Sequence, residues 1–520
     1  MIYRILSSAR LLSVFILLLL TILWTSCTKN YNSINTDPTR LTSLATEDIK
    51  GLFTNAEYMA MYSGQGSAEY QYAQGFVADL YAQYSAITAT FDPTDRYNIS
   101  QEWLQEQWIG TFRAMAPLVN ILKQTTGPEK KALNAIARIW KVWTVHRATD
   151  YYGPFPYFHI GFDSTSVPYD NQKDIYLDLF KELKEASADL NQNISQDSYG
   201  DADVIFGGDN SKWLKFANTL RLRLAIRISG VEPAMAKSEA EAAVVAGVLT
   251  DLSDDAYLKS SGVNYNGYLR QSGWNEFRMS ETMESYLVGY EDPRLSKFWQ
   301  PSVNTGLYKG VRNGMNVAEI VASENEPDNT SSPSDYLSPQ NLSTTPSTVM
   351  YTSEAYFLRA EGALNGWDMG VGTPKDFYEM GIEMSLRTWG ITDNAVITSY
   401  INSSNVPSAP GGYFNSAAVS DIPIQFSSDP EIQRNQIGTQ KWIALFPEGH
   451  EAWASFRQSG YPNLYPLIHS DNPDAPVGTF IKRVPFLNYD RDRNGPAVKA
   501  AEGLLGGPDK ISTALWWDIH

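Results

Sequence analysis

Apolar residues recur every three to four positions in five stretches of the chain, a spacing that places them on one face of an α-helix. The stretches are 132–146, 174–190, 213–228, 353–364 and 374–388. Asn365-Gly366 ends the fourth stretch and Pro374 suits the first turn of the fifth, so these two predict a helix hairpin. Small residues on its facing sides resemble a tetratricopeptide repeat, although the repeat period does not recur cleanly along the chain.

Four long stretches lack this periodicity and are rich in Ser, Asn, Asp, Gly and Pro: 91–100, 260–273, 325–346 and 403–430. Such loops on a helical scaffold often carry binding functions. No sharp change of composition marks a linker between domains. We therefore expect an all-α (mainly α) fold, a single large α-rich domain with tetratricopeptide-like helix pairs and long irregular loops.

The third helical stretch carries Arg221, Arg223 and Arg227 away from its apolar stripe. We interpret this charge run as a solvated or salt-bridged face rather than an anion site. His146 lies within the first stretch, where a hydrogen-bonded core residue is the more economical interpretation than a catalytic base.

The N-terminal segment has the features of a secretory signal. Arg4 and Arg10 precede an apolar run over 11–24, which is shorter than the roughly 20 residues that span a bilayer. Small polar residues then precede Cys27, as in a bacterial lipobox. We expect a lipoprotein signal peptide at 1–26, a lipidated Cys27 with its tether at 27–40, and the binding domain at 41–520.

Composition excludes several classes of protein. The 520 residues carry a net charge of −17, and removal of 1–26 takes away only Arg4 and Arg10, which leaves −19. An acidic surface argues against binding of nucleic acid, whose phosphates require a basic one. One Cys and five His leave no room for an internal disulfide framework and little for a His-rich metal centre.

Motifs for catalysis are lacking in the sequence. It contains no glycine-rich phosphate loop, no dinucleotide fingerprint, no His-Glu-x-x-His and no Gly-x-Ser-x-Gly. Carboxylate pairs such as Asp254-Asp255 and Glu291-Asp292 occur in any acidic protein, and a glycosidase needs two carboxylates across a cleft. We expect a binding protein rather than an enzyme, with no organic cofactor.

One pattern resembles a metal site. Asp490, Asp492 and Asn494 place oxygen atoms at positions one, three and five of a calcium loop, and Gly495 occupies the sixth. The twelfth position is Ala501, where such loops have a bidentate Glu. The segment is therefore either a calcium loop without that ligand or an Asx-rich turn.

The chain is rich in aromatic residues, with 14 Trp, 30 Tyr and 21 Phe. Those on the helical stripes are expected in the core. Others cluster in loops beside Asn and Asp, and these groups are Tyr81, Tyr84, Phe91, Tyr97 and Trp103, and Tyr265, Tyr268 and Trp274. Aromatic faces beside amides and carboxylates suit sugar rings and also peptides, while packing is the alternative for any one of them.

Several segments, which follow one another in the same order along the chain, resemble the SusD/RagB (SusD-like) outer-membrane nutrient-binding lipoproteins of the Bacteroidota. The segments are 34–38, 79–84, 137–156, 292–294, 355–389, 436–453 and 515–518. The resemblance implies an α-helical scaffold with tetratricopeptide-like pairs. It also implies a lipid-anchored protein of the outer membrane, facing outward, that captures nutrient and acts as the lid of a SusC-like TonB-dependent transporter.

On this basis we predict a ligand site that includes Tyr84, Tyr97 and Trp274, with Asn98 as a polar partner. The family's glycan site supports Tyr97 and Asn98 by approximate position. The cargo is an oligosaccharide or an oligopeptide, since both occur in the family. Two other classes stay open: a lipid-anchored glycoside hydrolase or esterase, and a purely structural surface protein.

Overall fold

The computed structural model describes residues 45–63, 69–161 and 166–520. The chain divides into two compact units, Met1–Asp48 and Ile49–His520. The predicted signal peptide, Cys27 and the tether lie outside the described residues. In the part of the chain that is described, no helix combines the length and apolarity needed to cross a bilayer.

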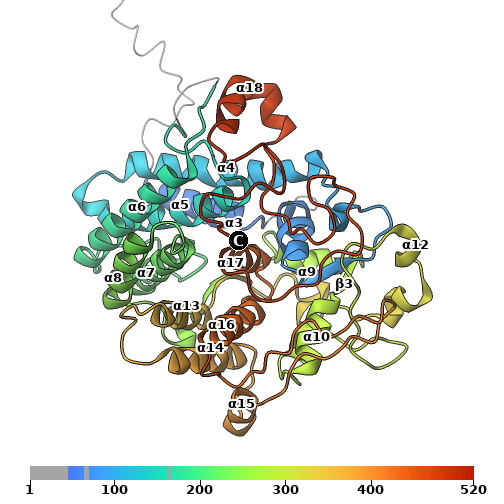
Figure 1. Cartoon of the computed structure of the whole chain (residues 1–520). Helices are drawn as coiled ribbons and strands as arrows, with labels where there is room; N and C mark the ends of the chain where they lie inside the picture. The colour runs from blue at the N-terminus through green and yellow to red at the C-terminus, as the bar shows by residue number, and fades with distance from the viewer. Residues whose placement is uncertain (1–44, 64–68, 162–165) are drawn as a thin grey trace, which may run out of the picture. The chain divides into compact units, whose positions relative to one another are not determined.

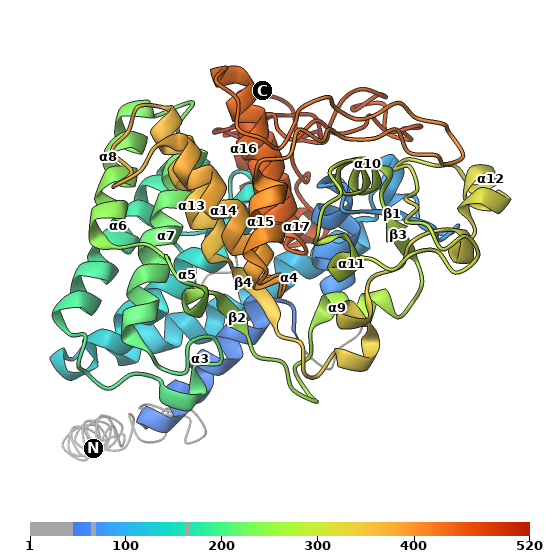
Figure 2. The ribbon, with the colours of Figure 1, turned by 90° about the horizontal axis from the view of Figure 1, so that it is seen from below.

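Helices dominate the unit Ile49–His520 and pack side by side in pairs (Figures 1 and 2). The pairs are α5 with α6, α7 with α8, and α13 with α14. We call α4–α8, α13, α14, α16 and α17 the helical region. The long helices are α3 Thr46–Ala60, α4 Gln101–Gln124, α5 Lys131–Tyr152, α6 Gln172–Gln192, α7 Asn210–Arg227, α8 Pro233–Ala246, α13 Thr352–Leu364, α14 Pro374–Thr388, α16 Pro430–Leu445 and α17 Gly449–Ser459.

All five predicted helices are present, with ends close to those expected from their capping residues. The α13–α14 hairpin begins its second helix with a capping box, in which Thr373 and Asp376 each satisfy the other's backbone N–H. Its helices touch closely, because a Cβ atom at Gly381 would lie 2.9 Å from the ring of Phe357. The prediction of a mainly α fold with tetratricopeptide-like helix pairs is confirmed.

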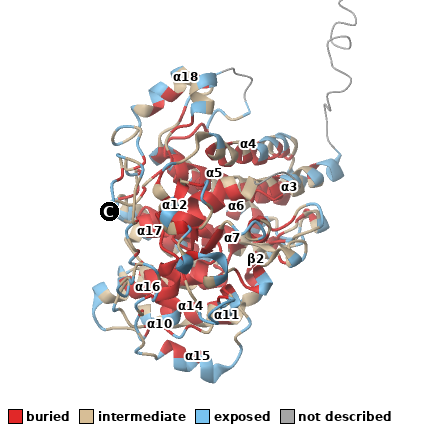
Figure 3. Ribbon diagram, turned by 90° about the vertical axis from the view of Figure 1, so that its right-hand side faces the viewer, coloured by how far each residue is buried: buried red, intermediate tan, exposed pale blue. Residues whose placement is uncertain are grey.

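The basic face of α7 lies inside the protein. Arg223 donates two hydrogen bonds to Glu354 on α13, at 2.6 and 2.7 Å, and both side chains are about 1% exposed. Arg227 donates to Glu451 on α17 at 2.5 Å. Of the two arrangements expected from the sequence, a solvated or a salt-bridged face, the structure shows the salt-bridged one. Figure 3 shows how buried residues concentrate in the inner helices around α7.

The loop-rich region, residues 256–350 together with strand β1, contains short elements. Strand β1 Ser85–Ile87 pairs antiparallel with β3 Phe277–Met279, and β2 Ala256–Leu258 pairs antiparallel with β4 Ser347–Met350. The short helices here are α9 Gly267–Ser272, α10 Glu281–Gly289, α11 Leu295–Phe298 and α12 Val317–Ile320. Two further helices lie elsewhere, α15 Asn394–Ile401 and α18 Asn488–Glu502.

Candidate functional site

The β1–β3 ladder brings two loops to the same end of a small sheet. Ile87 faces Phe277 at the end of the ladder. Beyond it, the backbone N–H groups of Thr88 and Ala89 both donate to the carbonyl of Glu276, at 2.9 and 3.2 Å. Phe91 follows this contact in one loop and Trp274 precedes it in the other. Two aromatic residues that are far apart in sequence therefore emerge close together.

These two rings are accessible from solvent, because Phe91 is 62% exposed and Trp274 is 37% exposed. Two further rings form a stack, in which Tyr72 lies on Trp103 with centroids 5.1 Å apart and an interplanar angle of 14°. Tyr72 belongs to the π-helix Gln71–Asp79, whose first residue donates a side-chain hydrogen bond to the Glu276 carboxylate. That bond ties the Tyr72–Trp103 stack to the loop of Trp274.

We call this group the aromatic surface: Tyr72, Phe91, Trp103 and Trp274 with the polar residues Asp92, Arg270 and Glu276. Arg270 places its guanidinium against the ring of Trp274, 5.6 Å from the centroid. It also lies 5.2 Å from the centroid of Tyr265, so the Trp274 ring is supported from behind.

Carboxylates give the aromatic surface a negative field. The pKa of Tyr72 is raised, first by partial burial and then by the charges of Glu276 and Asp92. Burial raises the pKa of Asp92 to about 6, against the lowering effect of its hydrogen bonds from Thr94. Flat rings flanked by hydrogen-bond acceptors can stack on the C–H face of a sugar ring and accept its hydroxyl protons.

Tyr84 lies in the core in this structure. Its side chain is 1% exposed, and its hydroxyl donates to the carbonyl of Trp442 at 2.5 Å. Its ring packs on Trp442 and Phe446 with centroids 5.1 and 5.2 Å away. No face of the ring is open for stacking, and its place here is that of a packing residue.

Tyr97 and Asn98 lie together but apart from Trp274. Both line a cavity of about 330 Å³ that Asp471 and Asn472 close from the other side. Tyr97 is only 3% exposed and its ring packs on Tyr81, whereas Asn98 is exposed. The structure therefore separates the predicted ligand residues into a core tyrosine, a small polar cavity, and Trp274 on the aromatic surface.

The segment expected as a calcium loop or a turn is part of helix α18. The chain is helical before a kink at Asn494, and a rotation of about 100° per residue turns Asp490 and Asp492 to nearly opposite sides. Asp490 accepts a hydrogen bond from Tyr169 at 2.6 Å, and Asn494 accepts one from Ser166 at 2.8 Å. Within the described residues no group of three or more His, Cys, Asp or Glu could hold a metal ion.

Asp254, Asp255 and Asp292, which belong to the carboxylate pairs noted in the sequence, all have structural partners. Asp254 accepts from Lys215 at 2.8 and 2.9 Å, and Asp255 accepts the backbone N–H of Thr352 at 2.7 Å. Asp292 forms a fully buried ion pair with Arg294 at 2.7 Å. Each of these carboxylates is therefore bonded to a neighbouring group of the protein.

The two histidines of the helical region are also internal. His146 is fully buried and hydrogen-bonds the carbonyl of Val142 at 3.2 Å, as expected for a core residue. His450 contacts the carbonyl of Arg147 at 2.9 Å. Burial and the neighbouring arginines lower the pKa of both imidazoles well below the ordinary value, which keeps them neutral.

Sequence reasoning placed Phe91 and Trp103 among the loop aromatics but did not select them as ligand residues, and it missed Tyr72. Tyr72 comes from an apolar stretch with no loop signal, so nothing local distinguished it from a core residue. The β1–β3 pairing, which joins positions almost two hundred residues apart, is what assembles the surface.

Comparisons with known proteins agree over nearly the whole chain. Residues 30–518 match the family model described as SusD-like, "Susd and RagB outer membrane lipoprotein". A search of curated protein sequences finds no significant match.

Similar solved structures include a chitin-binding SusD homolog from Flavobacterium johnsoniae, at 31% identity and a TM-score of 0.84, over 91% of this chain and 99% of that one. A SusD-like protein from Bacteroides thetaiotaomicron matches at 31% identity and a TM-score of 0.82, with the same coverage of both chains. A further match, described as a chitin-binding protein, is 28% identical with a TM-score of 0.75, over 91% of this chain and 100% of that one. The chain therefore belongs to the SusD-like family of outer membrane lipoproteins.

Proposed function

We propose that this protein is a cell-surface lipoprotein that binds an oligosaccharide and delivers it to a SusC-like TonB-dependent transporter of the outer membrane. The observation that carries the proposal is the aromatic surface, where the exposed rings of Phe91 and Trp274 lie in loops joined at Glu276, whose carboxylate is partly exposed. Lipidation at Cys27 would hold the protein at the membrane, and the protein would act as the lid of its transporter.

Saccharide is preferred over peptide as the cargo for two reasons. Glu276 and Arg270 offer an acceptor and donors for sugar hydroxyl groups, and two similar proteins of the family are described as chitin-binding. We therefore take chitin-derived oligosaccharides as the first ligand to test. An oligopeptide is the second candidate.

Isothermal titration calorimetry of the purified protein with N-acetylchitohexaose tests the site. The Phe91→Ala/Trp274→Ala variant should bind at least about tenfold more weakly, because it removes both exposed stacking faces. Phe158→Ala is the matched control, since that ring is 43% exposed but lies outside the aromatic surface. Its affinity should equal that of the unmodified protein.

Equal affinity of the double variant and the control would reject the aromatic surface as the site. Binding of oligopeptides but of no oligosaccharide would show that the cargo is a peptide. The transporter is tested separately, by affinity purification from detergent-solubilised outer membranes, in which a SusC-like barrel should co-purify with the full chain. A preparation without any barrel protein would contradict the proposed lid role.

A further inference from the structure

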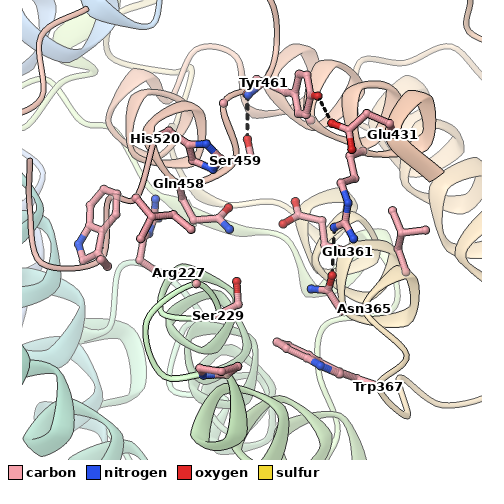
Figure 4. Close-up of a pocket in the computed structure, with 18 residues that line it drawn as sticks. Arg227, Ser229, Glu361, Asn365, Trp367, Glu431, Gln458, Ser459, Tyr461 and His520 are labelled. Atoms are coloured by element: carbon pink, nitrogen blue, oxygen red, sulfur yellow. Dashed lines mark hydrogen bonds between the residues drawn. The ribbon is translucent and has the colours of Figure 1, made fainter.

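A cavity of about 780 Å³ opens among the helices, away from the β1–β3 sheet. Its walls come from the ends of α7, α13 and α17, the start of α8, the first half of α16, and the segment 517–520. The volume falls in the range of about 300–1,000 Å³ that small-molecule sites commonly have. Figure 4 shows Ser229, Trp367 and Gln458 around the same open space.

Trp367 is held in this wall by the end of helix α13. Its backbone N–H donates to the carbonyl of Gly362 at 3.0 Å, and the N–H of Gly366 donates to Ala363 at 3.0 Å. This is a Schellman motif, and it depends on Gly366 with φ of 76°. The turn folds the indole back against the helix, where it stays partly exposed at the cavity.

Three neutral polar groups at the cavity have no hydrogen-bond partner among the described residues. They are the hydroxyl of Ser229, the side-chain amide of Gln458 and the indole N–H of Trp367. Together they offer donors and acceptors that the protein itself does not use. A ligand with several hydroxyl groups could satisfy all three at once.

The charged groups at the same cavity already make hydrogen bonds within the protein. Glu361 accepts from Lys441, Arg434 donates to Asn365 at 3.0 Å, and Glu431 accepts from the hydroxyl of Tyr461 at 2.5 Å. Arg227 reaches the lining, but its guanidinium donates to Glu451 in the core. A neutral ligand can use the three free polar groups without displacing any of these hydrogen bonds.

We propose that this cavity is a second binding site for a neutral saccharide of two to three rings, with one ring against Trp367 and hydroxyl groups bonded to Gln458 and Ser229. The proposal rests on the proposed function for its ligand class, but it uses none of the residues of the aromatic surface. The protein would then hold its cargo at two separate places, one in the loop-rich region and one among the helices.

Calorimetry with triacetylchitotriose, cellotriose and maltotriose, each titrated alone, tests the cavity. The unmodified protein should show two sets of sites for at least one of them. Trp367→Ala/Gln458→Ala should weaken one set about tenfold or more, and Phe91→Ala/Trp274→Ala should weaken only the other. Ser229→Ala and Gln458→Ala alone serve as milder variants, because neither side chain has a hydrogen bond to lose within the described protein.

The outcomes separate the two proposals. If Phe91→Ala/Trp274→Ala abolishes all binding and the cavity variants change nothing, the cavity is no saccharide site and the proposed function stands. If only the cavity variants lose affinity, the aromatic surface fails and the cavity stands. If none of the three trisaccharides binds, or if only charged peptides bind at the cavity, this inference is overturned.

Discussion

The helical region and the loop-rich region bury polar groups in different ways. In the helical region buried side chains pair with each other, as Arg223 does with Glu354 and Arg147 with Glu448 at 3.0 Å. In the loop-rich region the Asp292–Arg294 pair is also buried, but many other buried side chains serve the backbone. Ser280 donates to the carbonyl of Gln83 at 2.5 Å, and Asn313 donates to that of Ser85 at 2.8 Å.

The difference follows from how each region satisfies its main chain. A helix bonds most of its own N–H and C=O groups, so a buried charge on it pairs mostly with other side chains, although Arg457 on α17 donates to the carbonyls of Asp150 and Lys482. An irregular segment leaves main-chain groups without such partners, and nearby Ser and Asn side chains supply them. The helical region is thus held largely by buried ion pairs, the loop-rich region largely by bonds from side chains to the main chain, and the rings of Phe91 and Trp274 stay exposed to solvent.

The largest effect is expected from breaking an ion pair of the helical region. Arg223→Met leaves the buried carboxylate of Glu354 without its bidentate partner, and such losses cost about 3–5 kcal/mol. Urea unfolding followed by circular dichroism measures the change. Arg387→Met is the control, because the Arg387–Glu383 pair on α14 is 24% and 31% exposed and should contribute under about 1 kcal/mol. Similar losses in both variants would show that burial does not set the strength of these pairs.

An intermediate, pH-dependent effect is expected at Asp79, where the end of the π-helix Gln71–Asp79 meets α17. Burial raises the pKa of this carboxyl to about 8, although Gln74 and Tyr70 donate hydrogen bonds to it. The folded protein therefore keeps a proton that the unfolded chain releases near pH 4. Between about pH 4 and 8 this group makes stability fall as the pH rises, by at most about 1.4 kcal/mol per pH unit.

Asp79→Asn removes that proton equilibrium while keeping a neutral side chain of the same shape. The variant should match the unmodified protein near pH 4 and exceed it in unfolding free energy at pH 8 to 9. Urea unfolding at a series of pH values measures the difference. A difference that does not change with pH would mean that Asp79 is ionised in the folded protein.

The same contrast explains which features were predictable from sequence. The helices over 131–152, 172–192 and 210–227 were predictable because apolar spacing and capping residues are local signals. The burial of Arg223 was not, because its partner lies 131 positions away. The core position of Tyr84 likewise depends on Trp442, which is 358 positions away.

The candidate site was predictable only in part. Trp274 was named from sequence as a loop aromatic and is exposed, whereas the loop of Phe91 and the segment of Tyr72 meet its loop only through the β1–β3 pairing and Glu276. At Asp490 the local spacing matched a calcium loop, yet the segment is helical and its carboxylate is bonded to Tyr169. Oxygen atoms at the right spacing in sequence converge only if the backbone curls around them, and a helix does not.

The smallest effect on stability is expected where the effect on binding is largest. Phe91 keeps 62% of its surface in water, so truncating it removes little buried apolar area, and Trp274, at 37%, is partly buried against Arg270. The Phe91→Ala/Trp274→Ala variant should unfold within about 2 kcal/mol of the unmodified protein in urea, less than the loss of a buried ion pair. A loss of several kcal/mol would instead mean that these rings hold the two loops together. The variant's loss of saccharide affinity would then reflect a disordered surface rather than missing ring contacts. The contrast between a helical region that stabilises the fold and an aromatic surface that does not would fail.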